Sequence, residues 1–137
     1  MRRITDLIET HGVDVDPHLD REALVPVSTG LQRQGDVIVI PSGIAGRGTA
    51  NATRAVPRAG TPVVRSEAGG NTHLLLADGP VRYDPAPRDL TLGILTVEDG
   101  ATAYLAHAEH GYAGIGPGTY VVRRQREQAD EIRMVAD

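Results

Sequence analysis

The chain has 137 residues, and its 14 basic and 18 acidic side chains give a formal net charge of −4. It contains no cysteine, which excludes a disulfide framework, a thiolate metal site and a cysteine nucleophile. Every basic side chain is an arginine, which excludes mechanisms that depend on lysine, and the net negative charge argues against nucleic acid as a partner.

The length is typical of one domain, and we expect residues 1–137 to form a single domain with its own hydrophobic core. That core must consist mainly of Val, Ile, Leu and Ala, because the sequence has no Phe and no Trp. No segment has the apolar run of a signal peptide or the roughly 20 apolar residues of a membrane span. We therefore expect a cytoplasmic protein with no membrane partner.

The first 30 residues differ from the rest of the chain in their pattern of apolar and polar side chains. Residues 3–10 place apolar side chains at helical spacing, which predicts a short amphipathic helix that ends near Gly12. Residues 13–30 mix acidic residues, two prolines and scattered aliphatics, so we expect an irregular arm. Within the arm, residues 24–27 have the pattern of a short edge strand, where a proline is tolerated.

Residues 31–137 have the pattern of a β domain. Glu98-Asp99-Gly100 and Gly116-Pro117-Gly118 are strong hairpin turn signals, and residues 41–60 form a long glycine-rich segment that we expect to be a mobile loop. About seven to nine short strands favour an all-β barrel or sandwich. The expected strands are residues 36–40, 62–67, 73–77, 81–83, 90–97, 101–107, 112–115 and 119–123, while the tail 125–137 fits either a helical turn or a strand.

The segment from His107 to His110 is the strongest candidate for a functional site, because it places two imidazoles and the Glu109 carboxylate within four residues. Such groups bind divalent metals or transfer protons near neutral pH. If the strand continues, alternation puts His107 and Glu109 on one face and His110 on the other. If the chain leaves the strand at Ala108, one helical turn brings the two histidines together instead.

These residues support a metal hypothesis. His73 opens a separate strand, and it could join His107 and either Glu109 or His110 around one divalent ion with a position left open for water. A set of histidines and a carboxylate suits Zn, Fe(II), Mn or Ni. The alternative is that these are ordinary histidines at the rim of the domain, since the H-x-E-H spacing matches no specific metal motif.

A second hypothesis needs no metal. Two histidines, His110 among them, could form a general acid/base site with Tyr120 and one arginine that stabilises a phosphoryl transition state, as in a small nuclease or phosphodiesterase. The arginine would be Arg124, Arg123 or Arg126.

A third hypothesis concerns the arginine-rich stretch 123–127. Alternation places Arg124 and Arg126 on the face of Tyr120, and Arg123 on the other face. We expect this stretch to be a solvated or subunit-facing edge strand, so that the domain would be a structural or adaptor module. Its partner would be another copy of the chain, in a homo-oligomer, or a different protein.

Several of these segments together resemble an uncharacterised family of small bacterial β proteins. The pattern consists of Gln34-Gly35-Asp36-Val37, a glycine-rich turn that leads into His73, His107 to His110, Pro117 to Val122, and Arg124 to Glu127. The resemblance implies no established activity. The relatives often carry a second histidine after the position of His73, where this chain has leucines, which implies a weakened site here.

The chain is also similar in part to the cupins, small β-barrels that bind metals through histidines, so a cupin-like or β-clip-like architecture is one expectation. The cupin ligands cannot be transferred, because the second cupin motif places its histidine after the P-x-G turn. Here the histidines precede Gly116-Pro117-Gly118.

Overall fold

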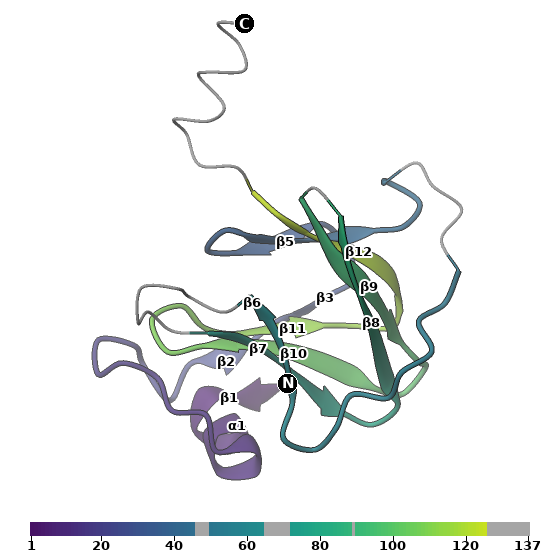
Figure 1. Cartoon of the computed structure of the whole chain (residues 1–137). Coiled ribbons are helices and arrows are strands. Elements are labelled where there is room, and N and C mark those ends of the chain that lie inside the picture. The colour runs from purple at the N-terminus through teal and green to yellow at the C-terminus, as the bar shows by residue number, and fades with distance from the viewer. Residues whose placement is uncertain (46–49, 65–71, 89, 126–137) are drawn as a thin grey trace, which may run out of the picture.

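The computed structural model describes residues 1–45, 50–64, 72–88 and 90–125, and it confirms an all-β protein with one short N-terminal helix (Figure 1). Among these residues, no helix combines the length and the apolar character needed to cross a membrane. The elements are β1 (Arg2–Arg3), α1 (Ile4–His11), β2 (Leu24–Val25), β3 (Val27–Ser28), β4 (Gln32–Gln34), β5 (Val37–Pro41), β6 (Thr61–Val64), β7 (His73–Asp78), β8 (Val81–Arg88), β9 (Thr91–Val97), β10 (Thr102–His107), β11 (Gly111–Ile115) and β12 (Gly118–Arg124).

Two five-stranded sheets face each other as a sandwich, with orders β3-β11-β10-β7-β6 and β4-β5-β12-β9-β8 (Figure 1). We call them the first and the second sheet. Their inner faces enclose a largely aliphatic core that includes Leu75 and Leu105 of the first sheet and Val37, Leu95 and Tyr120 of the second. Alternation along each strand sends these side chains inward.

 The core residues of the second sheet are Val37, Val39, Val81, Tyr83, Leu95, Val97, Tyr120 and Val122.

The outer face of the first sheet is covered as well. Helix α1 turns Ile4 and Leu7 toward this face, where they pack with Leu76, Tyr104 and Tyr112 in a second apolar cluster. Strands of the first sheet are therefore buried on both faces, which explains the nearly continuous burial of β10.

The prediction of an arginine-rich edge strand is wrong. Strand β12 is hydrogen-bonded to β5 on one side and to β9 on the other, so it lies in the middle of the second sheet. It offers no free edge for pairing with another chain. A homo-oligomer or a partner protein remains a prediction that rests on no contact in this structure.

The glycine-rich segment predicted as a mobile loop is partly fastened to the second sheet. In its described part, Val56 donates its backbone N–H to Val81 O, and Arg54 O accepts the N–H of Tyr83. Asp84 accepts the N–H groups of Thr53 and Arg54. This segment therefore runs along β8, the outermost strand of that sheet.

Some predictions concern residues that the structure does not describe. They are residues 46–49 of the glycine-rich segment, the end of the expected strand at 65–67, the turn at 68–71, and the tail from Arg126 onward, with Glu127.

Candidate functional site

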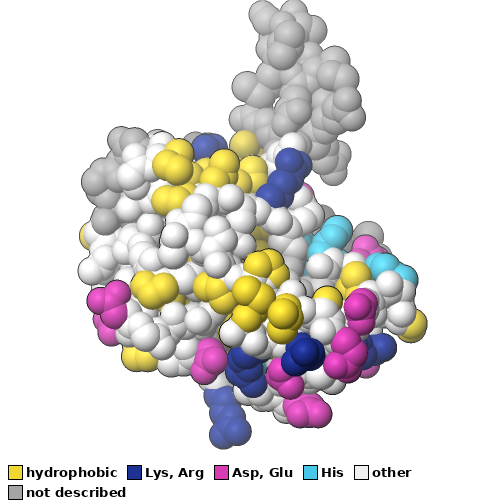
Figure 2. Space-filling view, turned by 180° about the vertical axis from the view of Figure 1, so that it is seen from behind, with side chains coloured by type: hydrophobic (Ala, Val, Ile, Leu, Met, Phe, Trp, Pro, Cys, Tyr) yellow, Lys and Arg dark blue, Asp and Glu magenta, His cyan; other side chains and the backbone are white. Residues whose placement is uncertain are grey.

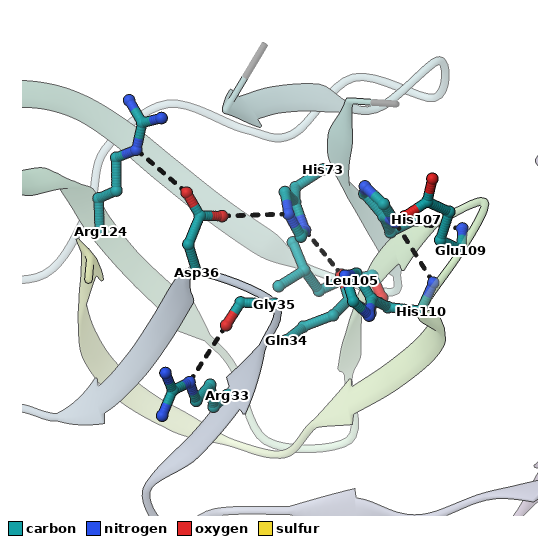
Figure 3. Close-up of polar contacts among 10 residues, drawn as sticks. All are labelled: Arg33, Gln34, Gly35, Asp36, His73, Leu105, His107, Glu109, His110 and Arg124. Atoms are coloured by element: carbon teal, nitrogen blue, oxygen red, sulfur yellow. Dashed lines mark hydrogen bonds and ion pairs between the residues drawn. The ribbon is translucent and has the colours of Figure 1, made fainter. Parts of the chain in front are cut away.

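Three histidines meet at one end of the sandwich (Figure 3). His73 is the first residue of β7, His107 is the last residue of β10, and His110 lies in the turn between β10 and β11. The ring centroids are 4.3 Å apart for His73 and His107, 4.6 Å for His107 and His110, and 6.1 Å for His73 and His110. Figure 2 shows histidine side chains at the surface of the molecule.

Strand register explains why His73 and His107 meet. Strands β7 and β10 are antiparallel, with Leu74 opposite Ala106, so the next step of the same register places His73 opposite His107. Each histidine lies two residues from an inward leucine, and alternation therefore turns both rings toward the space between the sheets. Both side chains are buried, with an exposed fraction of 5% for each residue.

His107 shapes the turn that carries His110. Its Nδ1 accepts the backbone N–H of Glu109 at 3.1 Å and that of His110 at 3.3 Å. A ring nitrogen that accepts hydrogen bonds presents its lone pair to them, so Nε2 carries the proton of the neutral ring. The chain thus leaves the strand at Ala108, and of the two arrangements predicted from the sequence, the one with His107 and His110 together is confirmed.

Gln34, at the end of β4, fixes the tautomer of His73. The Nε2 group of Gln34 donates to Leu105 O at 2.8 Å and to Gly111 O at 3.2 Å, which leaves its Oε1 as an acceptor 3.0 Å from His73 Nδ1. His73 must therefore donate through Nδ1–H, and its Nε2 carries the lone pair in the neutral ring.

That lone pair faces Asp36, which lies in the two-residue turn between β4 and β5. His73 Nε2 is 3.5 Å from Asp36 Oδ1, and the other carboxylate oxygen accepts a hydrogen bond from Arg124 Nε at 3.1 Å. The side chain of Asp36 is 42% exposed, so the pair lies where the buried histidines meet solvent. A chain of contacts therefore runs from Arg124 through Asp36 and His73 to Gln34 (Figure 3).

Gly35 packs closely against two of the rings because it has no side chain. Its φ of 58° suits a tight hairpin turn and strains any residue with a side chain. A Cβ on Gly35 would lie 3.0 Å from His110 Nε2 and 3.2 Å from His73 Cε1. The imidazoles of His73 and His110 thus lie so close to Gly35 that a side chain at position 35 would displace them.

Burial lowers the pKa of His73 from its usual 6.5 to about 4. The neighbouring His107 lowers the pKa further, while Asp36 raises it. His73 is therefore neutral at physiological pH, with the lone pair of Nε2 available.

The residues predicted for the two chemical hypotheses do not all gather here. Glu109 is exposed, and its backbone rather than its carboxylate makes the contact with His107. Tyr120 is 1% exposed in the core, where its hydroxyl donates to Gly116 O. It lies four residues before Arg124 on β12, roughly 13 Å along the strand, so the structure does not bring it to the histidines.

No group of three or more His, Cys, Asp or Glu side chains within the described ranges is arranged to hold a metal ion as it stands. Sequence reasoning also missed Gln34 and Asp36 as members of the site. Their signal in the sequence is the Gln34-Gly35-Asp36-Val37 run, whose pattern alone assigns them no chemical role.

The comparisons with known proteins give a family and no activity. No curated protein and no solved structure matches this chain significantly. Residues 33–125, which contain Gln34, Asp36, all three histidines and Arg124, match the model of a domain of unknown function, DUF8820. The chain therefore belongs to the DUF8820 family.

Proposed function

We propose that this domain binds a divalent metal ion through His73 Nε2 and Asp36 Oδ1, with His110 as a third ligand and a position left open for water or substrate. The observation that carries the proposal is the contact between His73 and Asp36. Because His73 donates through Nδ1–H to Gln34, its Nε2 turns a lone pair toward a carboxylate oxygen 3.5 Å away. Two lone pairs that face each other are stabilised by a cation between them.

The spacing of these two atoms fits a shared metal. Zn²⁺ binds nitrogen and oxygen ligands at about 2.0–2.2 Å, so two ligands at a tetrahedral angle lie about 3.3–3.5 Å apart. The nitrogen and the oxygen are 3.5 Å apart, and a small adjustment of the Asp36 side chain would complete the geometry.

The surrounding contacts are those that commonly support a metal ligand. A metal-binding histidine usually donates its second ring N–H to a fixed acceptor, and here Gln34 Oε1 is that acceptor. A metal-binding carboxylate is usually hydrogen-bonded in turn, and here Arg124 donates to the oxygen of Asp36 that does not face His73.

This proposal changes the ligand set expected from the sequence. His73 stays, but His107 uses its Nδ1 lone pair to cap the turn, so a metal at its Nε2 would require an imidazolate or the loss of both backbone contacts. The exposed His110, whose ring already packs against Gly35, replaces His107 and Glu109 after rotation about its side-chain bonds toward His73. Zn, Fe(II), Mn and Ni all suit a mixed set of imidazole and carboxylate ligands. A metal with an open position can activate a bound water molecule at neutral pH.

The test is metal binding by protein that has been stripped with a chelator and titrated with Zn²⁺ and Co²⁺ in a calorimeter. Wild-type protein should bind one equivalent, and His73→Ala should weaken binding by more than about a hundredfold, because it removes a ligand. His18→Ala is the control, since His18 is an exposed histidine in the N-terminal arm. Wild-type protein that binds no metal, or a His73→Ala protein that binds it equally well, would overturn the proposal.

A second variant tests the close packing of His73 and His110 against Gly35. Gly35→Ala should abolish binding by placing a methyl group between His73 and His110. Gly100→Ala introduces the same backbone strain, since Gly100 has a φ of 82°, but a Cβ there meets no atom within 4 Å. If both variants fold and bind metal like the wild type, His110 is not a ligand.

A further inference from the structure

We propose that His11 is an acid-sensitive latch that holds the start of the N-terminal arm against the turn that carries His110. At neutral pH the latch is closed. In mild acid the ring of His11 takes up a proton and leaves its place, and residues 11–16 detach from that turn. The latch does not depend on a bound metal ion, because neither His11 nor its contacts belong to the proposed metal site.

The first observation is the burial of one nitrogen of His11 without a partner. His11 is the last residue of α1, which lies on the outer face of the first sheet (Figure 1). Its ring packs against that of Tyr104 in β10, with the centroids 6.2 Å apart. The Nε2 atom is buried and has no hydrogen-bond partner among the described residues. A protonated imidazole donates from both ring nitrogens, so a proton here would be buried without an acceptor.

The second observation is the charge around this ring. The guanidinium of Arg2 in β1 opposes a positive charge on His11, whereas Asp78 at the end of β7 favours one. Arg2 already donates to the Asp78 carboxylate at 3.3 Å. Tyr104, the third titratable group beside the ring, stays neutral because burial raises the pKa of its hydroxyl. Burial first, and Arg2 second, therefore lower the pKa of His11 from its usual 6.5.

The direction of the pH effect follows from this lowered pKa. A detached His11 has the usual pKa of about 6.5, and the docked ring has a lower one. As the pH falls through this window, the detached form binds the proton first, and the equilibrium shifts toward it. Above the window the ring is neutral in both forms, so the latch keeps its full strength at neutral pH.

The third observation is the connection between the latch and the turn. Shortly after His11, Val13 O accepts the hydroxyl of Tyr112 at 2.6 Å, and Asp16 donates its backbone N–H to Ala108 O at 2.8 Å. Ala108 lies between His107 and His110 in the turn from β10 to β11. When the arm detaches, Ala108 O loses its donor, and the turn becomes freer to move.

The experiment measures native-state hydrogen exchange by NMR on the metal-free full chain, at about pH 7.5 and at about pH 5. The quantity of interest is the ratio of the protection factors of the Asp16 amide at the two pH values. This ratio should be larger in wild-type protein than in His11→Phe by about threefold or more, because Phe keeps an aromatic ring at this position and cannot take up a proton. Other groups that bind protons, such as His73 with its pKa of about 4, contribute equally to both proteins.

Two further variants make the comparison specific. His11→Gln is neutral at every pH and should give the same small ratio as His11→Phe, even if the phenyl ring packs poorly. His18→Phe is the matched control, because His18 is an exposed histidine of the same arm, and it should give the wild-type ratio. In the wild type, the ring signals of His11 should titrate at a lower pH than those of His18.

Each outcome decides the inference. It is overturned if wild type and both His11 variants give the same ratio, or if His11 titrates at the same pH as His18 or above it. The amide of His110 should respond together with that of Asp16, and a response at Asp16 alone would overturn the link to the turn. Because no metal is present in these samples, failure here leaves the metal site standing, and failure of the metal titration leaves the latch standing.

Discussion

At the scale of single residues, Gln34 connects the two sheets at the site. It belongs to the second sheet, yet its side chain contacts three strands of the first: it donates to carbonyl oxygens of β10 and β11 and accepts from His73 of β7. It is 5% exposed, so water cannot replace these partners. The rotamer and tautomer of His73 therefore depend on a residue far from it in the sequence.

Gln34→Glu tests this role with almost no change in shape. A carboxylate cannot donate to Leu105 O or Gly111 O, and it places negative charge against two carbonyl oxygens. We expect the free energy of unfolding to fall by about 2–4 kcal/mol, measured by urea denaturation at neutral pH. Gln32→Glu is the control, because Gln32 also donates to two carbonyl oxygens but is only partly buried. Equal losses in the two variants would contradict the role given to Gln34.

The sequence predicts that the histidines lie close together, but it does not predict the role of each one. His73 and His107 lie at strand ends in a pattern that periodicity can find, and the turn at Ala108 is one of the two arrangements that the sequence predicts. The role of His107 as a cap for that turn depends on backbone N–H groups, which no side-chain pattern reveals. Asp36 acquires its role only when the two sheets pack, since its partners come from β7 and β12.

At the scale of elements, strand β8 is the outermost strand of the second sheet, and a segment before it protects its free edge. The edge position explains why β8 continues through Pro85 and Pro87, where the sequence predicted an end at Tyr83. Asp84 holds the covering segment by accepting the backbone N–H groups of Thr53 and Arg54, and these contacts lower the pKa of its carboxyl group.

Asp84→Ala should loosen this segment. Without the carboxylate, the N–H groups of Thr53 and Arg54 lose their acceptor, and we expect their amide hydrogens to exchange faster with solvent. Hydrogen exchange followed by NMR measures this residue by residue. Asp20→Ala is the control, because Asp20 accepts the N–H of Glu22 in the N-terminal arm and should leave residues 53 and 54 unchanged. Unaltered exchange at Thr53 and Arg54 in Asp84→Ala would show that other contacts hold the segment.

Strand order was harder to predict than strand existence. Most of the strands expected from apolar runs are present, but β4 has only three residues, two of them glutamines, and gave no apolar signal. The arginines at the end of β12 predict an edge strand, whereas the strand is central and only its last residues are exposed. Neighbours in a sheet are set by long-range packing, which local patterns do not contain.

At the scale of the whole molecule, the first sheet lies between two apolar clusters. One fills the sandwich, and the other is closed by helix α1 and the N-terminal arm over the outer face. The family model begins at residue 33, so the covering residues lie outside the segment that it matches. The outer faces of β7, β10 and β11 are apolar, with Leu76, Tyr104 and Tyr112. The helix and the arm shield these side chains from water.

The covering helix should therefore contribute to global stability as a core element does. Leu7 is fully buried in the outer cluster, and Leu7→Ala should lower the free energy of unfolding by about 2–5 kcal/mol, because it removes packed methyl groups and leaves a cavity. Leu24 is 50% exposed, and Leu24→Ala makes the same chemical change with an expected loss below about 1 kcal/mol. Both are measured by urea denaturation followed by circular dichroism.

The shape of the transition separates two ways in which the cover could be attached. If α1 and the sandwich unfold as one unit, Leu7→Ala shifts a single transition, and the environment of the histidines is lost at the same urea concentration as the sheet signal. If the cover only rests on the sandwich, Leu7→Ala releases it in a separate early transition while the sheet signal remains. The burial of β10 on both faces favours the first outcome, because His107 is continuous with residues that α1 covers, Tyr104 and Ala106. A separate early transition would mean that the site is held by the sandwich alone.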